Sequence, residues 1–137
     1  MSEQSLVFIK PDGVKRQVVG EVINRFEKKG LKLINLELRQ LSGEESDRHY
    51  QEHVDKAFYP GLKEFILSGP VVLMVWEGDS AISVIRRLVG DTDSREAAPG
   101  TIRGDLSLSK GENIIHASDG PESAAREIEH FFGLVHS

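Results

Sequence analysis

Val71-Val72-Leu73-Met74-Val75-Trp76 is the stretch that decides the fold, because every residue in it is apolar. Successive side chains of a strand point to opposite faces, so this run indicates a central strand covered on both sides. The turn sequence Ser68-Gly69-Pro70 marks its start. No other apolar run in the chain is longer, and this one is far too short to span a bilayer.

Helical patterns flank this strand. Leu62, Phe65 and Ile66 predict a short amphipathic helix before it, and Ser80–Val89 predicts a second one after it. Gly90 is expected to close the second helix.

The first forty residues show the same alternation of strand and helix. Ser5–Ile9 is an apolar run that ends in the turn sequence Lys10-Pro11-Asp12-Gly13. A helical pattern follows from Gly20 to Gly30. Leu31–Leu41 then alternates like a half-buried strand, with one slip after Leu33 that suggests a β-bulge.

The remaining segments complete a fold of four strands. Glu44–Val54 is expected to be helical with Ser42 as its cap, and Asp91–Asp105 is expected to be a long irregular loop. Asn113–Asp119 predicts a short strand that runs into a helix start at Pro121. The order predicts an α/β (α+β) ferredoxin-like sandwich, in which helices pack on the faces of a four-stranded sheet.

Composition limits the classes of function. A chain of 137 residues predicts a single domain, residues 1–137, and the absence of cysteine excludes disulfides and thiolate chemistry. The N-terminus lacks the pattern of a signal peptide, so we expect a cytoplasmic protein with no membrane partner. A net charge of −5 argues against nucleic acid as the main partner.

Histidines are the first candidates for chemistry. His116 ends a β-branched run beside a helix start, where backbone N–H groups favour anions, although a buried structural histidine is the simpler interpretation of this residue alone. His49 and His53 have the spacing of half a metal site, but no third ligand is apparent nearby, so we expect two solvated histidines.

A set of cations and amides suits a polyphosphate. Arginine binds phosphate oxygens through a planar fork, lysine supplies a point charge, and threonine or asparagine donates neutral hydrogen bonds. Phe58 could stack on a base or belong to the core. The motifs of P-loop proteins, dinucleotide-binding folds and protein kinases are all missing. The candidates are Lys10, Arg86, Thr92, Arg103, Asn113 and His116.

The chain resembles nucleoside diphosphate kinases from end to end. The segment Asn113–Asp119 resembles the active-site motif of that family, Ile9–Val14 its first-strand motif, Ser68–Val72 its central strand and Pro99–Asp105 its loop motif. The resemblance implies an antiparallel ferredoxin-like sheet and ping-pong transfer of the terminal phosphoryl group from a nucleoside triphosphate, mainly ATP, to a nucleoside diphosphate. It also implies a homo-oligomer, with a hexamer favoured over a tetramer or dimer, and Mg²⁺ held by the nucleotide phosphates with no metal ligand from the protein.

The same resemblance implies roles for individual residues. His116 would be the nucleophile that becomes phosphohistidine, Phe58 would stack on the base, and Tyr50 would lie near the histidine. Ser118 and Glu127 would support the histidine, because a carboxylate that accepts a proton from one ring nitrogen leaves the other free to attack. The phosphate and sugar contacts would come from Lys10, Arg86, Thr92, Arg103 and Asn113.

Two positions depart from the family pattern. Ala117 replaces a usual glycine, which matters only if the backbone there needs a positive φ. Lys110 stands where many relatives place an apolar residue beside the base, and its methylene stem could cover the ring.

The alternative to an enzyme is a regulatory module that binds nucleotide without catalysis. Such a module would need no histidine nucleophile.

Overall fold

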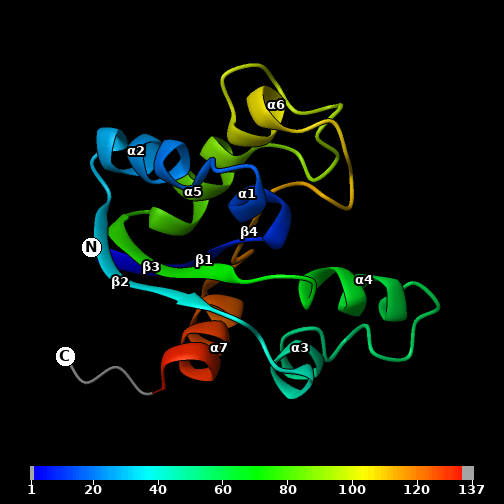
Figure 1. Ribbon diagram of the computed structural model, residues 1–137. Coiled ribbons are helices and arrows are strands. Elements are labelled where there is room, and N and C mark those ends of the chain that lie inside the picture. Colours follow the sequence, from blue (N-terminus) through cyan, green and yellow to red (C-terminus); the bar gives the residue numbers. More distant parts are fainter. Residues whose placement is uncertain (1, 134–137) are drawn as a thin grey trace.

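The computed structural model describes residues 2–133, which form one antiparallel sheet with helices on both faces (Figure 1). The strands are β1 (Ser2–Ile9), β2 (Lys32–Arg39), β3 (Val71–Asp79) and β4 (Ile115–Ala117), in the order β2-β3-β1-β4. β3 is an inner strand, and Val71–Trp76 is buried, as its apolar run predicts. The four-stranded ferredoxin-like architecture is therefore confirmed.

Helices α2 (Val19–Lys29) and α5 (Ala81–Val89) cover one face of the sheet, together with the short α1 (Pro11–Lys15) (Figure 1). Their apolar residues meet one set of strand side chains, among them Val7, Met74 and Trp76. The other short helix on this side is α6 (Ile102–Leu106).

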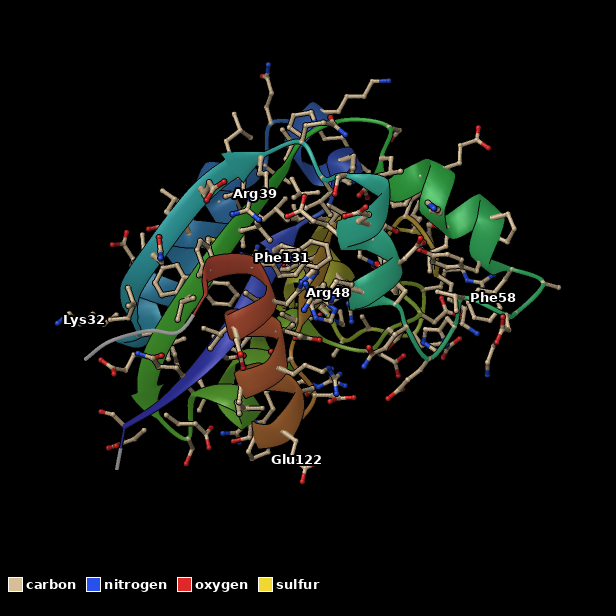
Figure 2. All side chains as sticks on the ribbon, turned by 90° about the horizontal axis from the view of Figure 1, so that it is seen from below. Lys32, Arg39, Arg48, Phe58, Glu122 and Phe131 are labelled. Carbon is tan, nitrogen blue, oxygen red and sulfur yellow. The ribbon has the colours of Figure 1, made fainter. Side chains whose placement is uncertain are left out.

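The opposite face is covered by α7 (Pro121–Phe132) and α3 (Gly43–His49), and α4 (Tyr59–Ile66) leads into the start of β3 (Figure 1). Leu6, Phe8 and Leu73 point to this face and pack against Phe131 of α7, which Figure 2 shows lying over the sheet. The two cores account for the uninterrupted apolar character of β1 and β3, because both sets of alternating side chains are buried.

Several boundaries differ from those expected. β1 begins at Ser2 rather than Ser5, because Ser2 to Gln4 pair with Asp79 to Glu77 through backbone groups that need no apolar side chain. The irregular loop ends at α6, which Thr101 caps by accepting a hydrogen bond from Gly104 N–H. The β-bulge after Leu33 is confirmed by the shift of register between Leu33 and Asn35.

The helix expected over Glu44–Val54 is wrong at its C-terminal end. Ser42 and Glu45 form a capping box at its start, as the cap prediction requires, but the helix ends at His49 and the chain continues in turns. Tyr50 packs against the core of the α7 face, which draws the chain away from the helix axis. Within residues 2–133, no helix has the length and apolar character needed to cross a membrane.

Candidate active site

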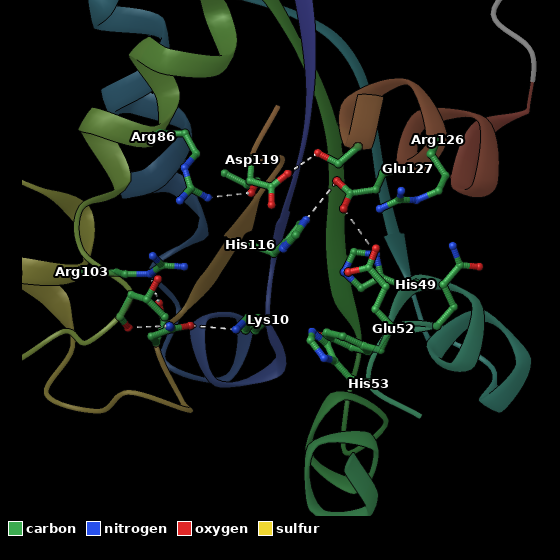
Figure 3. A pocket seen from close by; sticks show the side chains of 16 residues that line it. Lys10, His49, Glu52, His53, Arg86, Arg103, His116, Asp119, Arg126 and Glu127 are labelled. Atoms are coloured by element: carbon green, nitrogen blue, oxygen red, sulfur yellow. Dashed lines mark hydrogen bonds and ion pairs between the residues drawn. The ribbon is translucent and has the colours of Figure 1, made fainter. Parts of the chain in front are cut away.

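A cavity of about 260 Å³ opens where the ends of β1 and β4 meet α3, α5 and α7 (Figure 3). Eight of the site residues expected from the sequence line it, although they come from segments far apart in the chain. They are Lys10, Tyr50, Arg86, Thr92, Arg103, Asn113, His116 and Glu127.

A tight turn at Ile114 positions the central residues of the cavity. Ile114 has φ = +75°, and Ile115 N–H donates to Asn113 O at 2.9 Å across it. A positive φ at a buried β-branched residue costs about 1–3 kcal/mol, so the surroundings must hold it. The Asp12 carboxylate accepts from Ile114 N–H at 3.0 Å, and Lys10 N–H donates to Ile114 O at 2.7 Å.

His116 points to the α7 face of the sheet because of its register in β4. It lies opposite Phe8 of β1, and the two rings stack with centroids 4.9 Å apart. Its Nε2 lies 3.1 Å from Oε1 of Glu127, which α7 presents to the sheet, and Ser118 Oγ donates to the same oxygen at 2.7 Å. A carboxylate only accepts, so Nε2 carries the proton and Nδ1 keeps a lone pair.

Two buried cations stand on the other side of the cavity. Lys10 Nζ donates to Asn113 Oδ1 at 2.8 Å, and Arg103 Nη2 donates to Ile115 O at 2.6 Å. Burial and the charge of Arg103 lower the pKa of Lys10 to about 8, and burial and the charge of Arg86 lower that of Arg103 to about 10. Burial and neighbouring positive charge therefore disfavour the charged forms of both side chains, and an anion bound between them would relieve that cost.

The amide of Asn113 connects these groups to the loop after α5. Its Oδ1 accepts from Lys10, and its Nδ2 donates to Thr92 O at 2.9 Å. On the same side, Arg86 Nη1 donates to Ala117 O at 3.4 Å, a long bond that leaves the guanidinium facing the cavity (Figure 3).

Two expected site residues do not line the cavity. Ser118 is buried behind His116 and contacts it only through Glu127. Phe58 precedes α4 with 55% of its surface exposed, far from the sheet in Figure 2, and its ring centroid lies 5.5 Å from that of the cavity residue His53. Ala117 is not among the positive-φ residues of the described chain, so alanine is unstrained in β4.

The expectation that His49 is solvated is wrong, whereas His53 is partly exposed. Both line the cavity, and the His49 side chain is only 3% exposed, packed among Phe8, Tyr50 and His116. Burial and the nearby positive charges hold the pKa of His49 well below its usual value. Sequence reasoning missed it because α3 carries charges on its other faces, and the partner that could have identified it, Glu127, is distant in sequence. Asp12, which holds the Ile114 turn, was missed because Ile114 is likewise distant from it in sequence.

Comparison with known proteins identifies the family. The family model for nucleoside diphosphate kinase matches residues 3–135. The nucleoside diphosphate kinase of Staphylothermus marinus is 56% identical over 96% of this chain and 93% of its own length, and that of Bacillus licheniformis is 56% identical over 95% and 88%. The structure of a halophilic nucleoside diphosphate kinase from Halobacterium salinarum in complex with CDP superposes with a TM-score of 0.94 at 46% identity, covering 96% of this chain and 88% of that one.

The family model covers nearly the whole chain, and each of these relatives aligns over most of its own length. As nucleotide kinases, proteins of this family work with a divalent metal ion. The chain therefore belongs to the nucleoside diphosphate kinase family, phosphotransferases that move the terminal phosphoryl group of a nucleoside triphosphate to a nucleoside diphosphate.

Proposed function

We propose that His116 carries the phosphoryl group between the two half-reactions and that its Nδ1 is the attacking atom. The observation that supports this most directly is the 3.1 Å contact between Nε2 and the Glu127 carboxylate, which holds the proton on Nε2. Glu127 is itself positioned by Ser118. Among the described residues Nδ1 has no hydrogen-bond partner, and the ring lines the cavity that a nucleotide would enter.

In the first half-reaction the Nδ1 lone pair forms a bond to the terminal phosphorus. The bond from that phosphorus to its bridging oxygen breaks, and the nucleoside diphosphate leaves with the electron pair. In the second half-reaction a terminal oxygen of another nucleoside diphosphate attacks the phosphorus, and the P–N bond electrons return to Nδ1. One cavity serves both steps, because donor and acceptor differ by one phosphoryl group.

Lys10, Arg86 and Arg103 would bind the phosphates, and Thr92 and Asn113 would add neutral hydrogen bonds. Phosphoryl transfer depends mainly on positioning and charge neutralisation, which these groups can supply. Charge-assisted hydrogen bonds of this kind contribute about 1.5–3 kcal/mol each. Phe58 would stack on the base without reading its hydrogen-bonding groups, so we expect the enzyme to accept different bases. The main phosphoryl donor we propose is ATP. Tyr50, whose pKa burial raises, would stay neutral beside His116.

The donor chemistry of the cavity fits Mg²⁺ held by the nucleotide. Mg²⁺ prefers six oxygen ligands, and the one group of three His, Asp or Glu ligand atoms close enough to share an ion within residues 2–133 includes two histidines. Phosphate oxygens would therefore hold the ion, which would neutralise charge on the transferred group, and no protein residue is proposed as its ligand.

We also propose that residues 1–137 act as one cytoplasmic domain that assembles into a homo-oligomer, a hexamer rather than a tetramer or dimer. The single sheet with cores on both faces supports one domain. Exposed apolar side chains on the edge strand β2 support assembly. The net charge of −5 favours neither nucleic acid nor anionic membranes as partners.

The test is whether the protein takes up the phosphoryl group itself when no acceptor nucleotide is present. The protein is mixed with Mg²⁺ and a nucleoside triphosphate labelled on its terminal phosphoryl group, with no acceptor. We expect acid-labile, alkali-stable label on His116 that leaves when a nucleoside diphosphate is added. His116→Ala should take up none, whereas the control His130→Ala, on α7 outside the cavity, should be labelled normally. Transfer by His116→Ala at the wild-type rate would refute the proposal.

A further inference from the structure

His49, His116 and Glu127 line the cavity and turn ligand atoms toward one another (Figure 3). One atom from each residue lies within 4.8 Å of the other two. Glu127 lies between the histidines, with Oε1 at 3.1 Å from His116 Nε2 and Oε2 at 3.9 Å from His49 Nδ1. The imidazole rings are almost perpendicular, at 87°, with centroids 4.6 Å apart.

Phosphoryl transfer leaves the polar atom of His49 unexplained. The side chain is 3% exposed, and its Nδ1 is buried with no hydrogen-bond partner among the described residues. An unsatisfied buried polar atom of this kind costs about 1–3 kcal/mol. Burial lowers the pKa of this imidazole and so favours its neutral form, which is the form that ligates metals.

The donor set is that of a zinc site. Two imidazole nitrogens and a carboxylate are typical of zinc enzymes, in which a fourth position stays open. With ligand bonds of about 2.0–2.2 Å, tetrahedral geometry separates the ligand atoms by about 3.3–3.6 Å. The contacts of 3.1 and 3.9 Å involve different oxygens of Glu127, and one atom from each of the three residues lies within 4.8 Å of the other two. Side-chain shifts of up to about 1 Å would bring the three donors to the separations of a tetrahedral site. The fourth position would face the cavity, which also gives the ion its entry route.

We propose that His49, His116 and Glu127 form an inhibitory site for Zn²⁺. Zinc on His116 Nε2 would use the lone pair of that nitrogen, so the proton now held there would move through solvent to Nδ1. The neutral ring would keep one proton, and Glu127 would remain a carboxylate throughout. Nδ1 would then carry a hydrogen where it must carry a lone pair to attack phosphorus.

The site distinguishes zinc from the magnesium that the reaction uses. Mg²⁺ demands near-octahedral oxygen coordination, whereas two of the three donors here are imidazoles. Magnesium would therefore stay with the nucleotide phosphates while zinc occupies the imidazoles. The binding step follows from this geometry alone, and the inhibitory step rests on the proposed function.

Binding is tested without nucleotide or magnesium. Co²⁺ is titrated into the protein and the visible d–d absorption of four-coordinate Co²⁺ is recorded, then Zn²⁺ is added to displace it. We expect one site per chain. His49→Gln should weaken zinc binding by about 10- to 100-fold or more, since even losing a residue that only supports a ligand has that effect. The matched control, His53→Gln, changes a second cavity histidine outside the cluster and should bind zinc like wild type.

Inhibition is tested in excess Mg²⁺ at buffered concentrations of free Zn²⁺. We expect His116 labelling to fall as the site fills, and His49→Gln to require more zinc by the factor measured in the titration. Wild-type zinc affinity in His49→Gln, no d–d band, or inhibition that does not depend on His49 would each overturn the inference. Absence of transfer in magnesium alone would instead refute the proposed function and leave the Co²⁺ result standing.

Discussion

At the scale of single residues, Glu127 decides which nitrogen of His116 is free. Its carboxylate accepts from Nε2 at 3.1 Å, a charge-assisted bond. Glu127→Gln keeps the shape and removes the charge. Such a bond contributes about 1.5–3 kcal/mol. Losing that contribution in the transition state should lower kcat by about 10- to 100-fold.

The rate of His116 phosphorylation in Glu127→Gln measures this loss, and ¹⁵N NMR of the ring reports the tautomer. We expect a proton on Nε2 in the wild type and a mixture in the variant. Glu129→Gln, an exposed position on the same helix, should change neither. A wild-type tautomer together with a wild-type rate would show that Glu127 only fills space.

Lys10 makes stability depend on pH. Its pKa falls from 10.5 to about 8 on folding, so the unfolded chain binds the extra proton between those values. Stability must therefore rise with pH across that window, by about 3 kcal/mol for a shift of this size. Below about pH 8 the folded protein bears the full cost of the buried ammonium.

Urea unfolding of wild type and Lys10→Met, without nucleotide, at pH values from 7 to 10.5 tests this. Over that range the free energy of unfolding of the wild type should rise by up to about 3 kcal/mol relative to that of the variant. Lys15→Met replaces an exposed lysine on the adjacent α1, and its difference from wild type should stay flat. Parallel curves for wild type and Lys10→Met would contradict the lowered pKa.

The sequence identifies the cavity residues better than it explains their arrangement. Lys10, Arg103 and Asn113 are recognisable by residue type and motif, and the structure brings them together. That both cations are buried, and that burial and a neighbouring arginine lower the pKa of each, follows only from packing. His49 shows the limit most clearly, because nothing in its charged neighbourhood in the sequence reveals that Phe8 and Glu127 enclose it.

At the scale of elements, α1 can approach β1 and the Ile114 turn only because Gly13 has no side chain. A Cβ at Gly13 would lie 2.6 Å from Cγ2 of Ile9 and 3.1 Å from Cγ2 of Ile114. Gly13→Ala should therefore destabilise the fold by about 1–3 kcal/mol through overpacking. It should also lower activity, because the same turn carries Asn113 and His116.

Gly20→Ala in α2 is the matched control for Gly13→Ala. A Cβ there meets nothing within 4 Å, and alanine is the better helix former, so stability should rise by about 0.5–1 kcal/mol. Urea midpoints and transfer rates of both variants provide the comparison. Equal stability of the two variants would mean that α1 can shift without cost.

Elements with a strong pattern of their own are predicted well. The apolar run of β3 and the bulge of β2 appear as expected, but past the bulge Leu36 and Leu38 are exposed rather than half-buried. The end of α3 is not predicted, because no glycine or proline stops the helix and only the packing of Tyr50 turns the chain. Similarly, polar Ser2 to Gln4 extend β1 only because β3 offers its backbone opposite them.

At the scale of the whole molecule, the edge strand β2 exposes apolar side chains that an isolated chain gains nothing by exposing. It is an edge strand, with β3 as its one neighbour in the sheet, and Leu36 and Leu38 on one of its faces are 49% and 66% exposed. Edge strands with exposed apolar side chains pair with other chains unless protected. This surface agrees with the proposed homo-oligomer and predicts that β2 takes part in it.

Sedimentation of the wild type and of Leu36→Lys combined with Leu38→Lys tests this assembly. We expect a hexamer for the wild type and a smaller species for the double variant, because buried unpaired lysines oppose association. Val54→Lys places one added lysine at another exposed apolar position, in the turns after α3, and should leave the assembly intact. A monomeric wild type would refute the oligomer, whereas an unchanged double variant would place the interface away from β2.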